Sequence, residues 1–288
     1  MNTKLIVLLS GALSLGAVAT ASAADMAVKA PMAAPVVASW TGFYIGVDVG
    51  GRWSDANWTT TCLQQGFAAC PAANFPARFA FNNPSNYNSS GFKGGGYGGY
   101  NWQMSNWVVG VEGDVQWGDN KRTKAGIPGA NDPTIAGSPG LDSSSIRQNW
   151  EASLRGRLGV LVTPGVLFFG TGGVAFTNVE SSGFCGTAFP VGWCSAGAGT
   201  FVGTSQTRSS DRVGWTVGAG VEAMVTSNWL LRGEYRYADY GKYSSTIFAG
   251  QGGGALNADA VTYDTSLRTH SVTVGLAYKF GGPVVAKY

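Results

Sequence analysis

Hydrophobic and polar residues alternate along residues 269–280, near the end of the chain. One set of alternate positions is apolar or aromatic: Val272, Val274, Leu276, Tyr278 and Phe280. The positions between them are small or polar. Because side chains along a β-strand point alternately to opposite faces, this pattern predicts a strand with one apolar and one polar face. Such a strand fits a soluble sandwich with its apolar face inward, or a membrane barrel with that face outward.

Seven further segments are predicted to be strands: residues 41–53, 91–102, 107–117, 150–161, 166–180, 213–225 and 229–240. The segment 166–180 alternates poorly, so its two faces stay unassigned. Short turns and long connections follow one another regularly, and the long connections (54–90, 118–149, 181–212 and 241–268) are rich in Gly, Ser, Asn and Thr. This asymmetry predicts an all-β fold: an eight-stranded antiparallel up-and-down transmembrane β-barrel with short periplasmic turns and long extracellular loops.

The placement of tryptophan favours the membrane barrel over the sandwich. Most tryptophans lie at or beside predicted strand ends, whereas Trp58 and Trp193 fall in long connections. Indole rings prefer the membrane–water boundary, where barrels carry two aromatic girdles, and a sandwich core would bury tryptophan at mid-strand. The predicted girdle comprises Trp40, Trp53, Trp102, Trp107, Trp117, Trp150, Trp215, Trp229, Tyr278 and Phe280.

Charged residues gather on the other face of the strands. In a barrel they face the lumen, where acids and bases nearly balance and can pair; in a sandwich they would form a solvated outer face. A lipid-facing Arg or Lys at the membrane midplane would cost about 2–4 kcal/mol. The predicted lumen charge network comprises Asp48, Arg52, Glu112, Asp114, Glu151, Arg155, Arg157, Glu222, Arg232, Glu234 and Arg236.

The first residues are typical of a secretory signal peptide, residues 1–23, with cleavage between Ala23 and Ala24. Residues 24–39 are rich in Ala and Pro and are predicted to be a flexible leader before a barrel domain at 40–288. No later segment has the roughly 18 consecutive apolar residues of a membrane-spanning helix. Only 12% of residues are charged and the net charge is +3, so no nucleic-acid partner is indicated.

The four cysteines form two close pairs in predicted loops. Because an exported chain meets an oxidising compartment, the pairs Cys62–Cys70 and Cys185–Cys194 are predicted to be disulfides. Zinc is the rival interpretation, but His270 is the only histidine and no Cys-x-x-Cys occurs, so no metal site or cofactor is predicted.

No catalytic residue is predicted. His270 falls by parity on the apolar face, where an interfacial polar role suits it better than catalysis, and no Gly-x-Ser-x-Gly elbow occurs. We therefore expect a protein that is not an enzyme.

Several segments, WTGFYIGVDVGG, GGGYGGYNWQ, WVVGVEGDVQWGD, SLRGRLGVL, GWTVGAGVEA, LLRGEYRYADYG and VTVGLAYKF, together resemble the alphaproteobacterial porin-like outer-membrane β-barrel proteins. These are often described as surface antigens, and their fold resembles the OmpA transmembrane domain. The resemblance implies a location in the outer membrane of a Gram-negative bacterium. It departs at residues 281–288, which follow Phe280 and end on a second aromatic, Tyr288.

Three functions stay open. The first is a structural, surface-exposed barrel with a charge-filled lumen; the second is a small passive diffusion pore; the third is a loop-based adhesin or small-ligand receptor. An interior that side chains just fill argues against a wide pore in an eight-stranded barrel. Expected partners are outer-membrane lipid and lipopolysaccharide, the barrel-assembly machinery and extracellular ligands of the loops; the sequence leaves the oligomeric state undetermined.

Overall fold

The computed structural model describes residues 36–37, 39–63, 82–129, 142–185, 204–249, 260–281 and 284–285. The predicted signal peptide, its Ala23–Ala24 cleavage site and nearly all of the leader lie outside these residues, as do Cys70, Trp193, Cys194 and Tyr288. The strands described below belong to one compact unit, Val36–Tyr288. No helix in the described ranges is long and apolar enough to cross a membrane.

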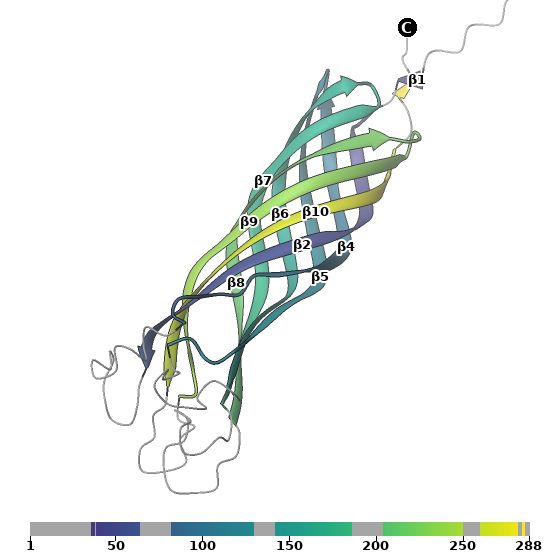
Figure 1. The fold of residues 1–288 in the computed structure, drawn as a ribbon. Helices are drawn as coiled ribbons and strands as arrows, with labels where there is room; N and C mark the ends of the chain where they lie inside the picture. Colours follow the sequence, from purple (N-terminus) through teal and green to yellow (C-terminus); the bar gives the residue numbers. More distant parts are fainter. Residues whose placement is uncertain are drawn as a thin grey trace, which may run out of the picture. The chain divides into compact units, whose positions relative to one another are not determined.

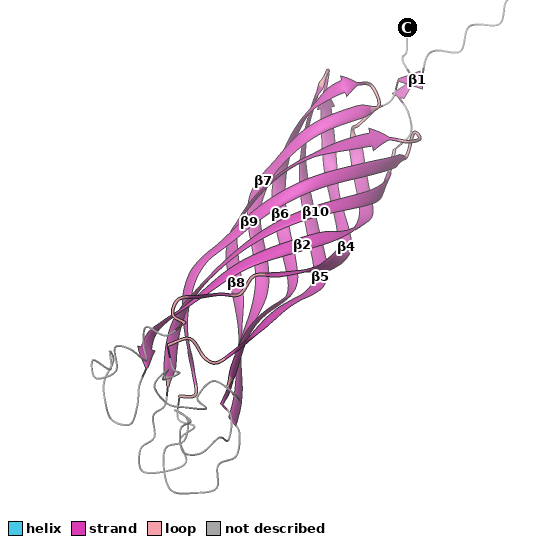
Figure 2. Ribbon diagram, in the orientation of Figure 1, coloured by secondary structure: helices cyan, strands magenta, loops and turns pink. Residues whose placement is uncertain are grey.

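Eight long strands form a closed antiparallel ring (Figure 1). Each pairs with its neighbours in chain order, and the ring closes where β10 pairs with β2, from Val261↔Leu63 to Lys279↔Tyr44. The all-β prediction of eight antiparallel strands is confirmed, and Figure 2 shows strands throughout. The long strands are β2 (Gly42–Leu63), β4 (Ser89–Met104), β5 (Trp107–Ala125), β6 (Ser143–Thr163), β7 (Val166–Cys185), β8 (Thr204–Met224), β9 (Trp229–Ile247) and β10 (Val261–Lys279).

Three two-residue strands complete the described structure. β3 (Ser85–Asn86) pairs with the distal part of β2. β1 (Val36–Val37) pairs with β11 (Val284–Val285), so the segment before the barrel and the tail beyond Phe280 meet in a small antiparallel sheet. The peptide N–H of Phe280 donates to the carbonyl of Phe43, which extends the ring closure by one residue.

The strands are longer than the sequence pattern predicts, mainly at the end remote from the short turns. The predicted strand 41–53 continues to Leu63, and the predicted strand 269–280 begins at Val261. Parts of all four predicted long loops are therefore strand, and Trp58, predicted in a loop, lies in β2 with 0% exposure. We refer to this strand region beyond the loop-side tryptophans as the extension.

The faces of β7, unassigned from the sequence, follow from burial. Leu167, Phe169, Thr171 and Ala175 point into the barrel, while Phe168 and Val174 lie on the outer surface. The apolar run 166–169 concealed the alternation because both of its faces are apolar. Leu167 and Phe169 pack in a buried apolar cluster inside the barrel, and Phe168 faces the lipid.

An apolar outer band lies between two rows of aromatic side chains. On β5 the band runs from Trp107 to Trp117, both more than half exposed. Ten residues at about 3.3 Å each, on a strand tilted by about 40°, span roughly 25 Å, the height of the apolar band of an outer-membrane barrel. The predicted girdle side chains Trp53, Trp102, Trp215, Trp229, Tyr278 and Phe280 are likewise exposed, and Trp150 is half-buried.

Trp40 is the exception, and its assignment to the girdle is wrong. Its side chain has 0% exposure and closes the turn-side end of the lumen, where Nε1 donates to the carbonyl of Pro164 at 3.1 Å. Its parity matches the inward residues Tyr44, Asp48 and Arg52, which was a better guide to its direction than its place at a strand end.

Candidate functional site

The described lumen of the barrel is filled in three main layers, with a polar belt between the second and the third. At the short turns lies an apolar layer, the turn-side cluster, formed by Trp40, Tyr44, Tyr97, Val108, Leu167, Phe169, Leu230 and Ala277. The charge network occupies the middle. Beyond it lies the loop-side cluster, formed by Ala56, Trp58, Tyr87, Ile127, Ile146, Ala175, Val179, Ala238, Tyr240, Tyr243, Ile247, Phe248, Val261, Tyr263 and Leu267.

The charge network is buried and balanced. It contains six carboxylates and six cations, all at most 9% exposed: Asp48, Glu112, Asp114, Glu151, Glu222 and Glu234, with Arg52, Lys93, Arg155, Arg157, Arg232 and Arg236. These residues come from β2, β4, β5, β6, β8 and β9, because strand alternation turns every second side chain of each strand inward. The structure thus brings together all eleven predicted lumen residues, although Asp48 is held differently.

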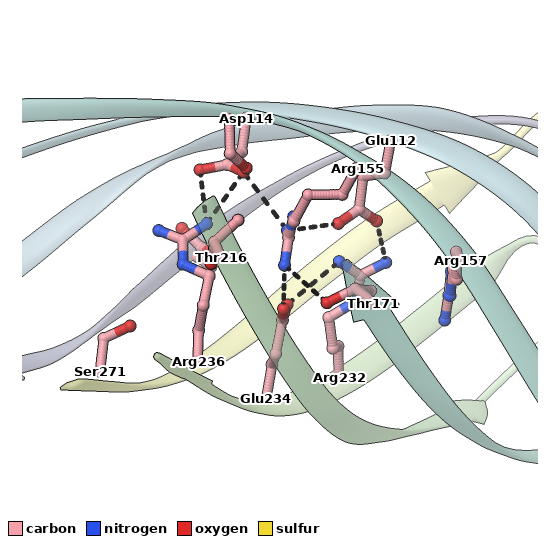
Figure 3. Close-up of polar contacts among 12 residues, drawn as sticks. Glu112, Asp114, Arg155, Arg157, Thr171, Thr216, Arg232, Glu234, Arg236 and Ser271 are labelled. Atoms are coloured by element: carbon pink, nitrogen blue, oxygen red, sulfur yellow. Dashed lines mark hydrogen bonds and ion pairs between the residues drawn. The ribbon is translucent and has the colours of Figure 1, made fainter. Parts of the chain in front are cut away.

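Glu112 anchors the part of the network next to the turn-side cluster (Figure 3). Its carboxylate accepts from Arg155 at 2.7 Å and from Arg232 at 2.5 Å. Arg155 also pairs with Glu234, and Arg232 lies 3.2 Å from Glu222. The pairs Glu112–Arg232 and Glu234–Arg155 therefore cross the lumen, because their strands are not neighbours in the ring. The pairs Glu112–Arg155 and Glu222–Arg232 join neighbouring strands.

Arg236 and Glu151 anchor the part nearer the loops. Arg236 donates to both oxygens of Asp114 at 2.9 Å and to Glu151 at 2.5 Å. Glu151 also accepts from Lys93 at 2.6 Å and lies 3.5 Å from Arg52. Arg155 Nη2 lies 3.3 Å from Asp114 and joins the two parts, which makes the network continuous.

Asp48 is hydrogen-bonded rather than ion-paired within the described structure. Its Oδ1 accepts from Gln116 Nε2 at 2.7 Å. Lys279, also buried, lies at the turn-side end and makes no ion pair with the described acids. The balanced pairing is therefore concentrated in the middle layer.

Aromatic side chains bind the network to the turn-side cluster. Tyr44 donates its hydroxyl hydrogen to Glu112 Oε2 at 2.6 Å. The Arg232 guanidinium lies 4.2 Å from the ring centre of Tyr97, and that of Arg157 lies 4.1 Å from Phe169. Cations over ring faces gain electrostatic attraction when desolvated. Sequence reasoning left these aromatics out of the site, although parity places Tyr44 with Asp48. Lys93 has the parity of the inward face, but the predicted network did not include it.

A polar belt separates the charge network from the loop-side cluster. Ser54 donates to Gln148 Oε1 at 3.0 Å, and Gln148 Nε2 donates to Thr177 at 3.0 Å. Above the belt, the rings of Trp58 and Tyr263 stack with centres 3.7 Å apart. Burial in this cluster raises the pKa of the Tyr87 phenol to about 12, so Tyr87 stays neutral and hydrogen bonds to Ser144 at 2.6 Å.

His270 lies outside the barrel wall at mid-strand in β10. Its Nδ1 hydrogen bonds with the Tyr235 hydroxyl at 2.8 Å, and its Nε2 lies 3.9 Å from Asp55 Oδ2. Across the described ranges, no three His, Cys, Asp or Glu side chains come close enough to hold a metal ion.

Of the four cysteine side chains in the predicted disulfides, the structure describes only that of Cys62. Cys62, at the distal end of β2, is disulfide-bonded. Its predicted partner Cys70 lies outside the described residues, and so do Cys194 and the side chain of Cys185. Both pairings stay predictions.

The sequence of this chain is similar to those of known outer-membrane proteins. The family model of the outer membrane protein beta-barrel domain matches residues 10–280. The 31 kDa outer-membrane immunogenic protein of Brucella melitensis is 32% identical over 269 residues, which cover 91% of this chain and 94% of that protein. The 22 kDa outer membrane protein of Rhizobium leguminosarum is 28% identical and covers 68% and 70%. The solved structure of OprG from Pseudomonas aeruginosa aligns with a TM-score of 0.46 and 15% identity, over 84% and 97% of the two chains.

Proposed function

Since this chain belongs to the outer membrane protein beta-barrel family, we propose that it is a structural, surface-displayed barrel whose lumen is closed to solutes. One observation carries the proposal: a balanced charge network fills the middle of the lumen, between two apolar clusters. The protein resides in the outer membrane of a Gram-negative bacterium, as its relatives do.

Opening the lumen would require the network to separate. Glu151, for example, accepts from Lys93 and Arg236 at 2.6 and 2.5 Å with 3% of its side chain exposed. Leaving a buried charge without its partner costs about 3–5 kcal/mol. An eight-stranded barrel also has an interior that side chains just fill. A steady aqueous path through this lumen is therefore unfavourable.

Conductance across a planar bilayer tests the closed lumen. The purified full chain should show small or intermittent currents. Arg232→Ala should raise the current, because it removes a side chain from the lumen and leaves Glu222 with one fewer cation. Arg268→Ala, which removes an arginine that is 61% exposed on the outer surface, serves as the control. A large, steady current from the unaltered protein, unchanged by Arg232→Ala, would favour a diffusion pore instead.

We infer that the barrel carries no enzymatic activity of its own. The sole histidine, His270, contacts Tyr235 and Tyr237 on the outer wall, and Asp55 is 3.9 Å away. This arrangement suits a polar group at the membrane boundary, since no Ser, Thr or Cys nucleophile is paired with its ring in the described structure. Turnover of peptide or ester substrates that His270→Ala abolishes would contradict this inference.

We propose that the barrel-assembly machinery recognises β10 with Phe280 rather than the terminal Tyr288. Phe280 continues the ring through its bond to Phe43, and its ring lies 5.7 Å from that of Phe43. A chain truncated after Gly281 should reach the outer membrane at normal levels, whereas Phe280→Ala in the full chain should reduce assembly. The opposite result would assign recognition to Tyr288. We also propose that the extracellular loops contact extracellular ligands, without assigning a chemical identity to them.

A further inference from the structure

The barrel wall opens between β4 and β5 on the loop side. The β4–β5 ladder ends at Gly94↔Trp117, whereas β5 continues to pair with β6 as far as Ala125↔Ser143. Beyond Trp117, this edge of β5 therefore has no strand partner in the described part of the chain. β4 begins at Ser89, and the preceding residues follow β2 instead, through β3.

A cavity of about 420 Å³ lies in this opening. It is lined by Trp53, Asp55, Asn88, Ser89, Ser90, Lys121 and Arg122. Trp53 belongs to the loop-side girdle and is 49% exposed. Lys121 lies four residues beyond Trp117, and four residues extend a strand by roughly 13 Å. The cavity therefore has an indole at the edge of the apolar band and cations farther from the membrane centre.

The two cations of the cavity have no acidic ion-pair partner among the described residues. Neither Lys121 nor Arg122 makes an ion pair with any acid in the described structure. Other exposed arginines of the outer surface do have acidic partners: Arg147 lies 2.7 Å from Asp119, and Arg268 lies 3.1 Å from Asp239. Among the described lining residues Asp55 is the one carboxylate, so these residues contribute two positive charges and one negative charge.

The remaining lining residues offer hydrogen-bond donors. Ser89 and Ser90 carry hydroxyls and Asn88 carries an amide, and these stand across the opening from Lys121 and Arg122. Ammonium, guanidinium and hydroxyl groups together suit a phosphate, whose oxygens accept several charge-assisted hydrogen bonds. The order from indole to cations is also the order from acyl chain to headgroup in the adjacent leaflet.

We propose that this cavity binds a phosphate group of a phosphorylated glycolipid in the outer leaflet, with the acyl chains lying along the Trp53 side. The site goes beyond the closed-barrel function, because it assigns one specific lipid contact to one seam of the wall. Lys121 and Arg122 hold the phosphate, and Trp53 contacts the apolar part of the same molecule.

Binding to the purified full chain in detergent tests the proposal, with native mass spectrometry as the readout. The probes are phosphorylated lipid A, its dephosphorylated form and inorganic phosphate. Lys121→Gln combined with Arg122→Gln should weaken binding of phosphorylated lipid A roughly tenfold or more. The matched control is Arg208→Gln, which removes an exposed arginine from β8, three strands away from β5 in the ring, and should leave binding unchanged. Heat-dependent electrophoretic migration establishes that each variant is folded.

Three outcomes would overturn the proposal. Unchanged affinity in the double variant would show that Lys121 and Arg122 do not bind the lipid. An equal loss in Arg208→Gln would show that general surface charge, rather than this cavity, attracts the lipid. Equal affinity for dephosphorylated lipid A, or for inorganic phosphate alone, would show that the phosphate of a lipid is not what is recognised.

Discussion

At the depth of the apolar band, β9 turns Arg232, Glu234 and Arg236 into the lumen, and Leu231 and Tyr235 face outward. Beyond the loop-side girdle the same strand reverses this arrangement. There Ala238, Tyr240 and Tyr243 point inward. The outward positions Lys242 and Ser244 are exposed and polar.

β2 and β10 show the same reversal. Asp48 and Arg52 precede Ala56 and Trp58 on the inner face of β2, and all four are buried. From Asp48 to Trp58 the alternation of side chains on β2 does not change; the surroundings do. On β9 the alternation shifts by one residue between Tyr240 and Tyr243, where the β9–β10 register also shifts. Lipid around the barrel favours apolar side chains outside, whereas water around the extension favours them inside. One ring of strands therefore encloses the charge network in the membrane and the apolar loop-side cluster beyond it.

The largest expected effect comes from leaving a charge unpaired at membrane depth. Glu222→Gln removes the carboxylate that Arg157 contacts, and both residues have 0% side-chain exposure. We expect a loss of about 3–5 kcal/mol in the free energy of unfolding. Denaturant titration of the refolded barrel in lipid vesicles measures it. Adding Arg157→Met should recover a large part of the loss, because the stranded cation is then gone; a second variant as unstable as the first would contradict a role for pairing.

A cavity in the loop-side cluster should have a nearly comparable but local effect. Trp58→Ala removes a fully buried indole that stacks on Tyr263. Truncations of this kind typically cost about 3–5 kcal/mol, and water that enters the open end will relieve part of that cost. Hydrogen exchange should accelerate in the extension while amides at membrane depth keep their protection. Uniform loss of protection would mean that the two regions unfold together.

Replacing glycines on the inner and outer faces by alanine should have a smaller effect on stability, and the effect should differ between the two faces. A Cβ on the inward Gly95 would lie 2.1 Å from the carbonyl oxygen of Val115, whereas one on the outward Gly113 would lie 3.6 Å from the nearest atom, in Ser153. Gly95→Ala should therefore cost about 1–3 kcal/mol through overpacking. Gly113→Ala should be close to neutral. Thermal unfolding in matched detergent compares the two, and equal losses would contradict the inside–outside assignment of β4 and β5.

The smallest effect is expected for an ion pair on the outer surface. A hydrogen bond from Arg147 lowers the pKa of Asp119 below its ordinary value. A carboxyl with a lowered folded pKa stabilises above its unfolded pKa, and that stabilisation is lost as the pH falls through the folded value. Because the pair is exposed, Arg147→Gln should change stability by no more than about 1 kcal/mol at neutral pH. NMR titration should find the pKa of Asp119 raised toward its ordinary value in Arg147→Gln. An unchanged pKa would show that the two side chains do not interact in solution.

The alternation of residues, together with the regular succession of short turns and long connections and the placement of tryptophan, was sufficient to predict the eight strands, their order in the ring and the eleven inward charges within the membrane. It missed the extension because the polarity of the two faces reverses there. Asp55, Asn57 and Thr59 alternate with Ala56 and Trp58 in the sequence, but polar outward positions after a girdle tryptophan resemble a loop.

A one-dimensional pattern determines which face of a strand a residue occupies, since side-chain direction has a period of two. It does not determine how far along the barrel axis a side chain lies or which side chains it contacts. The pairing of Arg236 with both Asp114 and Glu151, the capping of the lumen by Trp40 and the early end of the β4–β5 ladder all depend on the register between strands. Register is set when the ring closes, because only then do residues far apart in the chain meet across one narrow lumen.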